Sequence, residues 1–210
     1  MTIEYEIEPT PGLPGVLPAG EAIVWQGSPD WQTLALSVFH TRLVALWFLV
    51  IAGLAFVAGG TGIRGALVTL LAAAAGLGVL YLLARAGARS TIYTLTNRRI
   101  VMRFGVALPK CINLPLAAIG AAGVRDLGND RVDIVLRPVQ RFPLGWMQMW
   151  PHVQPWKVAE PQPMLRAVPA SFAPMLAAAL IAADPERALR AVQRPGETGL
   201  TNQPAIGVAA

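Results

Sequence analysis

The chain has 210 residues, of which 54% are hydrophobic and 14% charged, with a mean hydropathy of +0.50 and a formal net charge of +5. A single cysteine, Cys111, excludes an intramolecular disulfide and a cysteine metal cluster. Acidic residues predominate before residue 43 and basic residues after residue 84. This composition indicates a membrane-associated chain with an acidic N-terminal arm and a basic C-terminal region.

Residues 1–42 predict an N-terminal arm with little regular structure. The opening MTIEYEIEP is acidic and has no apolar segment, so it does not resemble a signal peptide. Proline and glycine are frequent up to residue 20 and predict an extended chain. A short strand is predicted over Ala22–Gln26, followed by a turn at residues 28–30.

Two long apolar stretches follow, Leu43–Gly60 and Gly65–Ala84, and Arg64 is the one charged residue within this span. Each stretch has the roughly 20 residues that an α-helix needs to cross a bilayer. The joint between them is so short that the helices must be antiparallel. A buried hairpin of a soluble protein is the alternative, but such helices normally keep a polar stripe, which both stretches lack. We therefore predict a transmembrane helical hairpin over residues 43–84.

Small residues recur four positions apart in this hairpin and allow close approach of helix backbones. They explain either packing within the hairpin or a face for a partner's helix, including self-association with a second copy. The pairs are Ala55 with Gly59, Ala72 with Gly76, and Ala74 with Gly78.

Arginines gather just after the second apolar stretch and predict the topology. Arg85 and Arg89 lie at its end, whereas the loop between the stretches offers only Arg64. The positive-inside rule then places both termini of a multi-pass membrane protein in the cytoplasm. Three further arginines predict binding to anionic lipids rather than nucleic acid, with a role in orientation alone as the alternative. These are Arg98, Arg99 and Arg103.

From residue 90 the hydrophobic pattern alternates, which is typical of strands. STIYTLT and RIVMRFG flank a turn at Asn97-Arg98, and further short strands are predicted at Lys110–Leu114, Gly123–Asp126 and Val132–Leu136. These short strands in succession predict a small antiparallel sheet or barrel. A helix is predicted over Ser171–Ala183; it is too short to span a bilayer and should pack on the sheet or lie in the membrane interface. A second short helix to about Gln193 and a disordered tail over 195–210 complete the prediction.

The proline-rich stretch 138–168 predicts little regular structure but carries three tryptophans. Trp146, Trp150 and Trp156 are candidate partner-binding residues, because tryptophan is enriched in binding hot spots. The alternative is that these side chains fill the core or lie on lipid headgroups.

Signatures of catalysis or metal binding are missing from the sequence. No phosphate-binding loop, nucleophile elbow or zinc-protease motif occurs, so we expect no enzyme activity, no metal and no cofactor. Asp126, Asp130 and Asp133 lack the spacing of a calcium loop and are interpreted as a solvated turn. The two histidines, His40 and His152, support one alternative, in which either ligates the magnesium of bacteriochlorophyll.

Several blocks resemble the bacterial membrane-anchored pleckstrin-homology-like family. They include GEAIVWQGSPDW, YTLTNRRIVMRFG and NLPLAAI, and they lie on both sides of the helical hairpin. Within that family, WPHxxPW combined with PQPMLRxVP is similar to the reaction-centre assembly proteins of purple bacteria. The resemblance implies a PH-like barrel with a C-terminal helix on the cytoplasmic side of the bacterial inner (intracytoplasmic photosynthetic) membrane. With the sequence pattern, it predicts an α+β membrane protein: a cytoplasmic arm (1–42), a transmembrane hairpin (43–84), the PH-like domain (88–194) and a tail (195–210).

Two functions follow from these observations. The first, implied by the resemblance, is a non-enzymatic scaffold that binds nascent subunits of the photosynthetic reaction centre, with LH1 as a further partner. The second is a pigment-binding or pigment-delivery protein that uses one of the histidines. Bound pigment and its loss in a histidine variant distinguish the two.

Overall fold

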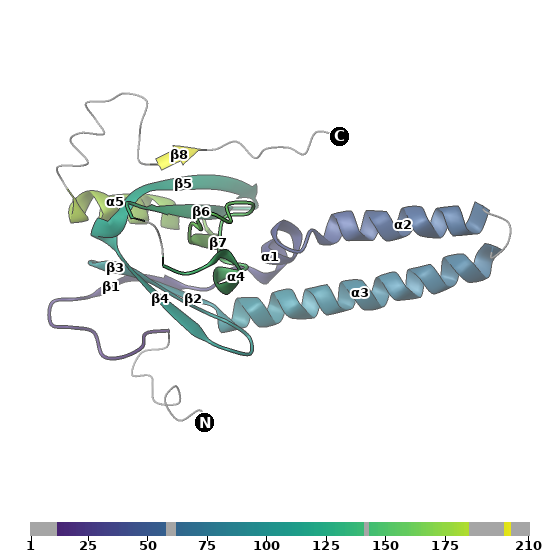
Figure 1. Cartoon of the computed structure of the whole chain (residues 1–210), viewed down its shortest axis with the longest axis horizontal. Helices are drawn as coiled ribbons and strands as arrows, with labels where there is room; N and C mark the ends of the chain where they lie inside the picture. Colours follow the sequence, from purple (N-terminus) through teal and green to yellow (C-terminus); the bar gives the residue numbers. More distant parts are fainter. Residues whose placement is uncertain (1–11, 58–61, 141–142, 185–199, 203–210) are drawn as a thin grey trace.

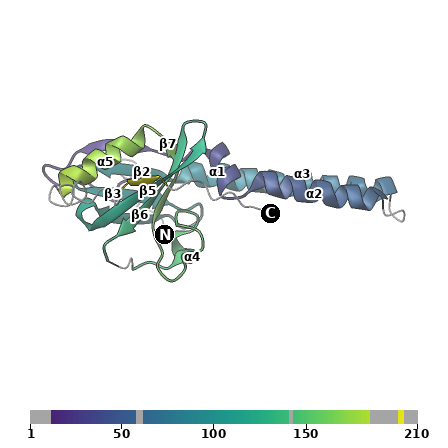
Figure 2. The ribbon, with the colours of Figure 1, turned by 90° about the horizontal axis from the view of Figure 1, so that it is seen from above.

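The computed structural model describes residues 12–57, 62–140 and 143–184, together with the backbone of residues 200–202. A body of two β-sheets carries a long pair of helices that projects from one end (Figure 1). The view from above shows the same straight projection, so the molecule is a body with a rod (Figure 2). The predicted helix at residues 185–193 and most of the predicted tail lie outside the described residues.

Three helices build the rod and its base: α1 (Trp31–Ser37), α2 (Thr41–Val57) and α3 (Gly62–Ser90). The Asp30 side chain caps α1 by accepting a 2.8 Å hydrogen bond from the Thr33 amide. Between α1 and α2 the axis bends by 55°, and His40 has a φ of 48° there. The sequence predicted the apolar stretches but not α1.

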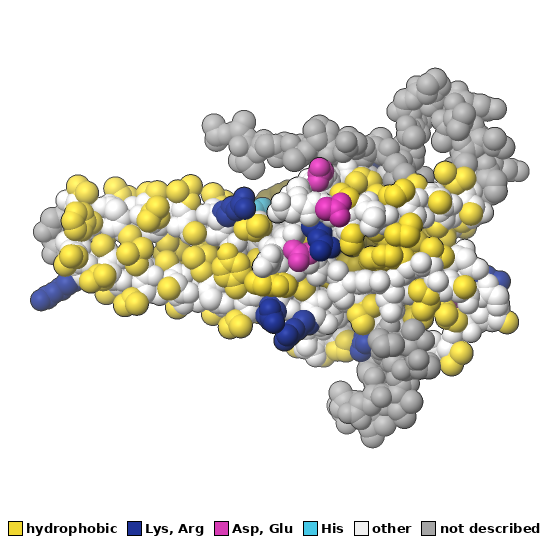
Figure 3. Space-filling model, turned by 180° about the vertical axis from the view of Figure 1, so that it is seen from behind, with side chains coloured by type: hydrophobic (Ala, Val, Ile, Leu, Met, Phe, Trp, Pro, Cys, Tyr) yellow, Lys and Arg dark blue, Asp and Glu magenta, His cyan; other side chains and the backbone are white. Residues whose placement is uncertain are grey.

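α2 and α3 lie side by side as an antiparallel pair (Figure 1). By length and composition, α3 can cross a membrane, and α1 with α2 can form another span only if the bent pair counts as one. Only 6% of the most apolar window of α3 is buried. Hydrophobic side chains accordingly cover the outside of the rod, and basic side chains lie at its far end and at its base (Figure 3).

The first sheet contains β1 (Ile23–Gly27), β2 (Ile92–Thr96), β3 (Arg99–Phe104) and β4 (Lys110–Pro115), in that order and antiparallel. β2 and β3 form the hairpin that the alternating pattern predicted, with its turn at Asn97 and Arg98. The Asn97 side chain holds the N-terminal arm, because it accepts from the Ala22 amide and donates to the Gly20 carbonyl.

The second sheet has the order β7-β6-β5-β8. β5 (Ile119–Gly128), β6 (Arg131–Pro138) and β7 (Met164–Pro169) are antiparallel, whereas β8 (Leu200–Asn202) pairs in parallel with β5. The sequence had placed residues 200–202 in a disordered tail. In the described part of the proline-rich stretch before β7, the regular structure is the short helix α4 (Trp146–Met149) and an isolated bridge between Val153 and Pro163.

The predicted closed barrel is wrong. β4 ends at Pro115, and the 3-10 turn η1 (Leu116–Ala118) redirects the chain, so that β5 begins the second sheet instead of extending the first. Proline has no backbone N–H to continue a ladder, which suits this end of β4. The fold is therefore α+β with two sheets, which are antiparallel except for the parallel strand β8.

The hydrophobic core lies between these sheets and beneath α5 (Phe172–Ala183). α5 contributes Phe172 and Leu176, and Trp25 of β1 lies 4.2 Å from Phe172, ring centre to ring centre. Full burial of each large side chain stabilises the fold by about 1.5–3 kcal/mol. The other large buried members are Tyr93, Leu95, Ile100, Met102, Leu116, Ile119, Ile134, Leu136 and Met149.

Candidate functional site

Asp133 and Arg166 form a buried ion pair between β6 and β7. The Arg166 Nη1 donates to the Asp133 carboxylate at 2.9 Å, and Arg125 donates to the same oxygen at 2.6 Å. The other Asp133 oxygen accepts from the Ala167 amide at 2.9 Å. Asp133 is fully buried, so the interpretation of this residue as part of a solvated turn was wrong.

Arg166 also fixes the course of the proline-rich loop that precedes β7. Its Nε donates to the Pro151 carbonyl at 3.1 Å, and its Nη2 donates to the Val153 carbonyl at 3.2 Å. With the bond from Nη1 to Asp133, all three guanidinium nitrogens of Arg166 donate hydrogen bonds. The planar donor geometry of arginine therefore links two strands to one loop.

His152 lies in this loop and continues the network to the rod. The Thr91 hydroxyl donates to the Gly87 carbonyl of α3 at 2.7 Å, so it accepts from the His152 Nε2–H at 3.2 Å. The His152 Nδ1 then accepts from the Tyr93 hydroxyl at 2.7 Å, and that hydroxyl oxygen accepts from the Arg166 amide at 3.1 Å. The donor and the acceptor of each hydrogen bond in this network are therefore defined, and His152 is the tautomer protonated at Nε2.

Burial keeps His152 and Tyr93, two ionisable side chains of this hydrogen-bond network, neutral. Burial, with the positive charge of Arg166 as the second cause, lowers the pKa of His152 to about 3. Burial also raises the pKa of Tyr93 above its ordinary value. Because both ring nitrogens of His152 are hydrogen-bonded, it cannot ligate bacteriochlorophyll in this structure. His40 is exposed and is the histidine that the pigment hypothesis retains.

The three predicted partner-binding tryptophans have different environments. Trp146 packs against the core, and its indole N–H donates to the Gln154 carbonyl at 3.0 Å, so its role here is structural. Trp150 is half-exposed and lies edge-on to Phe39, with ring centres 5.9 Å apart. Trp156 is 95% exposed. Only Trp150 and Trp156 can offer a binding surface.

The three predicted lipid-binding arginines are not grouped. Arg98 is exposed in the β2–β3 turn, at the end of the sheet away from α3, whereas Arg103 pairs in register with Ile92 beside the end of α3. Arg103 lies four strand positions after Arg99, which is about 13 Å along the strand. Of the three arginines expected to form a cluster, Arg103 alone therefore lies beside the end of α3.

Arg99 is paired with an acidic side chain of the same protein. Its guanidinium makes a bidentate ion pair with Glu21, at 2.6 and 2.9 Å. Burial by itself raises the pKa of Glu21, but the hydrogen bonds from Arg99 and Thr96 and the charge of Arg99 outweigh this and lower it below 4.5. This pair fastens the N-terminal arm to the first sheet.

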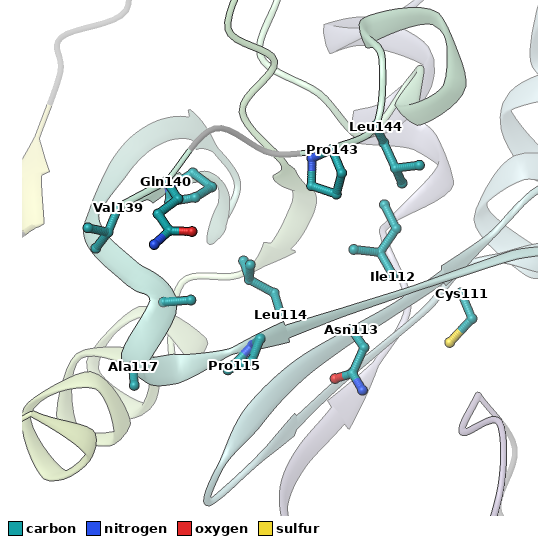
Figure 4. Close-up of a pocket in the computed structure, with 12 residues that line it drawn as sticks. Cys111, Ile112, Asn113, Leu114, Pro115, Ala117, Val139, Gln140, Pro143 and Leu144 are labelled. Carbon is teal, nitrogen blue, oxygen red and sulfur yellow. The ribbon is translucent and has the colours of Figure 1, made fainter.

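A cavity of about 580 Å³ opens between β4 and residues 138–140 and 143–144. Ile112 and Leu114 point toward Pro143 and Leu144 across it, whereas Cys111 and Asn113 point to the other face of β4 (Figure 4). None of its lining residues is charged or a histidine. Among the described residues, no group of three His, Cys, Asp or Glu side chains could hold a metal ion.

Comparison with known proteins gives the class of this chain. Residues 38–133, just under half of the chain, match the bacterial PH domain family. The chain is 36% identical over 174 residues to the Rhodobacter capsulatus protein called "Uncharacterized 23.7 kDa protein in puhA 5'region". The aligned part is 79% of this chain and 81% of that protein, so the chain belongs to the family of that protein. No solved structure matches the chain.

Sequence reasoning missed the central pair of the network. Asp133 lies inside the alternating segment VDIVL and Arg166 inside MLRAVP, so each is a charge within a predominantly apolar strand. A charge in such a segment must be paired when it is buried. The separation of the partners by 33 residues hid the pairing, because the order of the strands was unknown.

Proposed function

We propose that the chain is a non-enzymatic, membrane-anchored scaffold for assembly of the photosynthetic reaction centre in a purple bacterium, of the kind that PuhB represents. In this proposal α2 and α3 both cross the inner membrane, with α1 and α2 as one bent span, and both termini are cytoplasmic. The hairpin contacts nascent reaction-centre subunits and LH1. The PH-like domain stays at the membrane surface.

The exposed rod carries this proposal. Apolar side chains cover α2 and α3 on their outer faces, and the described part of the chain offers them no cover. A surface of this size and composition is stable only against lipid or the helices of other proteins. The most exposed examples are Leu43, Leu46, Trp47, Leu54, Leu67, Val68, Leu71 and Leu82.

Specific contacts hold α1 against α3 at the base of the rod and connect α3 to the body. Trp31 of α1 lies edge-on to Tyr81, with ring centres 6.3 Å apart, and the Arg85 guanidinium lies 5.6 Å from the Trp31 ring centre. The Thr91 hydroxyl ties the end of α3 to His152. A firm connection of this type suits a scaffold that holds a membrane partner and a cytoplasmic surface in fixed relation.

Two further observations support the assembly role. The Rhodobacter relative is named after its position in the puhA 5' region, and the sequence blocks WPHVQPW and PQPMLRAVP resemble those of reaction-centre assembly proteins. The buried polar groups of Asp133, Arg166, Tyr93 and His152 are hydrogen-bonded in one network, so none of these four side chains is available as an acid, base or nucleophile. This arrangement favours structure over catalysis.

A deletion strain tests this function. We expect loss of the gene to lower the amount of assembled reaction centre while bacteriochlorophyll synthesis is unchanged, and the intact gene to restore it. A variant in which an unrelated two-helix anchor replaces residues 41–90 controls for membrane attachment alone. Restoration by that variant would show that the hairpin is only an anchor. Unchanged reaction-centre levels in the deletion strain would overturn the proposal.

A further inference from the structure

Two separate segments of the PH-like domain carry large apolar side chains that are exposed. In the turn between β3 and β4, Leu108 is 76% exposed and Val106 is also exposed. In and after α4, Met147 is 79% exposed, Trp156 is 95% exposed, and Trp150 is half-exposed. We call these five residues the apolar rim. Side chains of this kind, grouped on a surface, mark a place of contact rather than a solvated face.

The β3–β4 turn and α4, with Trp150 at its end, lie at the end of the domain from which the rod leaves, and Trp156 follows Trp150 by six residues. β2 starts at Ile92, immediately after α3, and Ile92 pairs with Arg103, so the β3–β4 turn returns to this end. The Lys110 ammonium group then reaches the Gln148 carbonyl of α4 at 3.3 Å. In Figure 1 the β3–β4 turn and α4 both lie beside the base of α3.

The rim is continuous with the first helix of the hairpin. Trp150 lies edge-on to Phe39 with ring centres 5.9 Å apart, and Phe39 stands just before α2, which begins at Thr41. A side chain beside the start of a membrane span lies at the depth of the headgroups, where tryptophan is enriched. Lys110 and Lys157 flank the rim, and their ammonium groups can reach anionic headgroups while their stems follow apolar surface.

We propose that the apolar rim inserts into the boundary between headgroups and acyl chains, and that it holds the PH-like domain flat against the bilayer beside the hairpin. This inference rests on the proposed membrane-spanning hairpin. It moves the lipid-contacting surface from the predicted arginines to Val106, Leu108, Met147, Trp150 and Trp156. It also assigns the exposed tryptophans to lipid rather than to a protein partner.

Fluorescent labels on the full chain in lipid vesicles test the proposal. In a Cys111→Ser background, single cysteines replace Met147 and Val158, which flank the exposed tryptophans and are themselves exposed. We expect a quencher carried on the lipid chains to reduce emission from both labels, and aqueous iodide to leave it unchanged. A label at Arg98→Cys, in the turn at the opposite end of the sheet, should show the reverse pattern.

A label at Leu54→Cys in α2 distinguishes failure of the rim proposal from failure of the membrane-spanning hairpin. If lipid quenches the label at residue 54 but only iodide quenches those at 147 and 158, the rim proposal is overturned while the anchor stands. If iodide also quenches residue 54, the membrane-spanning hairpin fails. Protection of residues 147 and 158 that requires added reaction-centre subunits would make the rim a protein interface and likewise overturn the proposal.

A substitution in the rim gives an independent measurement. Trp156→Ser removes a side chain that has almost no packing in the protein, so the fold should be unaffected. We expect the label at Val158→Cys to lose its lipid quenching in this variant. Trp31→Phe is the matched control, because Trp31 packs against Tyr81 at the base of the rod and is not part of the rim. Unchanged lipid quenching with Trp156→Ser would contradict the proposal.

Discussion

Asp133 and Arg166 show how two buried charges can serve the structure of this domain. The carboxylate accepts three hydrogen bonds, and the guanidinium donates to two carbonyls as well as to the carboxylate. A buried pair of this kind contributes little net stability relative to a well-packed apolar pair. Removing one partner is costly, however, because the remaining charge cannot reach water.

The first prediction concerns this pair. Asp133→Asn leaves Arg166 buried without its counter-charge, and we expect a loss of about 3 kcal/mol in the free energy of unfolding. Denaturant unfolding of the purified chain in detergent, followed by tryptophan fluorescence, measures it. Asp126→Asn is the matched control, because the Asp126 side chain accepts only from the Gly128 amide in an exposed turn. Equal effects of the two substitutions would contradict the account.

The second prediction uses the titration of His152. The folded protein keeps this residue neutral with a pKa of about 3, whereas the unfolded chain has the ordinary value of 6.5. The unfolded state therefore binds more protons below pH 6.5, and stability falls as the pH decreases from there toward 3. Between pH 7.5 and pH 5 this residue removes about 2 kcal/mol of stability.

His152→Asn isolates that contribution from the carboxylates, which titrate in the same range. The asparagine oxygen can still accept from Tyr93 but does not titrate. We expect the stability difference between the natural chain and this variant to shrink by about 2 kcal/mol between pH 7.5 and pH 5. Denaturant unfolding at the two pH values measures it. A difference that is the same at both pH values would exclude a buried neutral histidine.

At the level of elements, the sequence predicted the strands better than their arrangement. Alternation identified the hairpin of β2 and β3, and β1, β4, β5 and β6 overlap the segments expected. α1 was missed because its sequence, WQTLALS, is short and follows a proline turn. The barrel was wrong because closure depends on which strands pair, and the redirection at Pro115 is a long-range feature that local pattern does not reveal.

The third prediction concerns the β3–β4 turn that carries part of the apolar rim. Gly105 has a φ of 124°, and a Cβ there would lie 2.2 Å from the Leu108 carbonyl oxygen. Because that atom belongs to the backbone, the turn must shift, and we expect Gly105→Ala to lower the free energy of unfolding by about 1–3 kcal/mol. The same unfolding measurement tests this substitution.

Gly145→Ala is the control for that substitution. Gly145 has a φ of −72°, and nothing lies within 4 Å of a Cβ at this position. We expect its effect to stay within about 0.5 kcal/mol. Similar losses for Gly105→Ala and Gly145→Ala would mean that the turn is not held in the described conformation.

For the whole molecule, the central relation is between a rod suited to the membrane and a body that is fastened to it. The candidate site was partly predictable at this scale. The tryptophan-rich stretch and the arginines stood out from composition. Only the structure separates partly buried Trp146 from exposed Trp156 and places Arg98 and Arg99 away from the end of α3. Exposure and distance depend on tertiary packing, which one-dimensional pattern cannot supply.

The fourth prediction tests the topology that the scaffold requires. Arg85 and Arg89 lie at the base of the rod, and Arg64 lies at its far end. We expect a periplasmic phosphatase fused at Gly62 to be active and the same enzyme fused after residue 193 to be inactive. Protein amounts from immunoblots control for expression. Activity at the second site with none at the first would reverse the orientation.

Purification of the tagged chain from solubilised photosynthetic membranes tests whether it is a scaffold for reaction-centre assembly. We expect reaction-centre subunits to co-purify, and the chain freed of them to show no bacteriochlorophyll absorption. His40→Ala should leave both results unchanged. Bacteriochlorophyll that remains on the isolated chain and disappears with His40→Ala, without reaction-centre subunits, would contradict the claim and establish a pigment carrier instead.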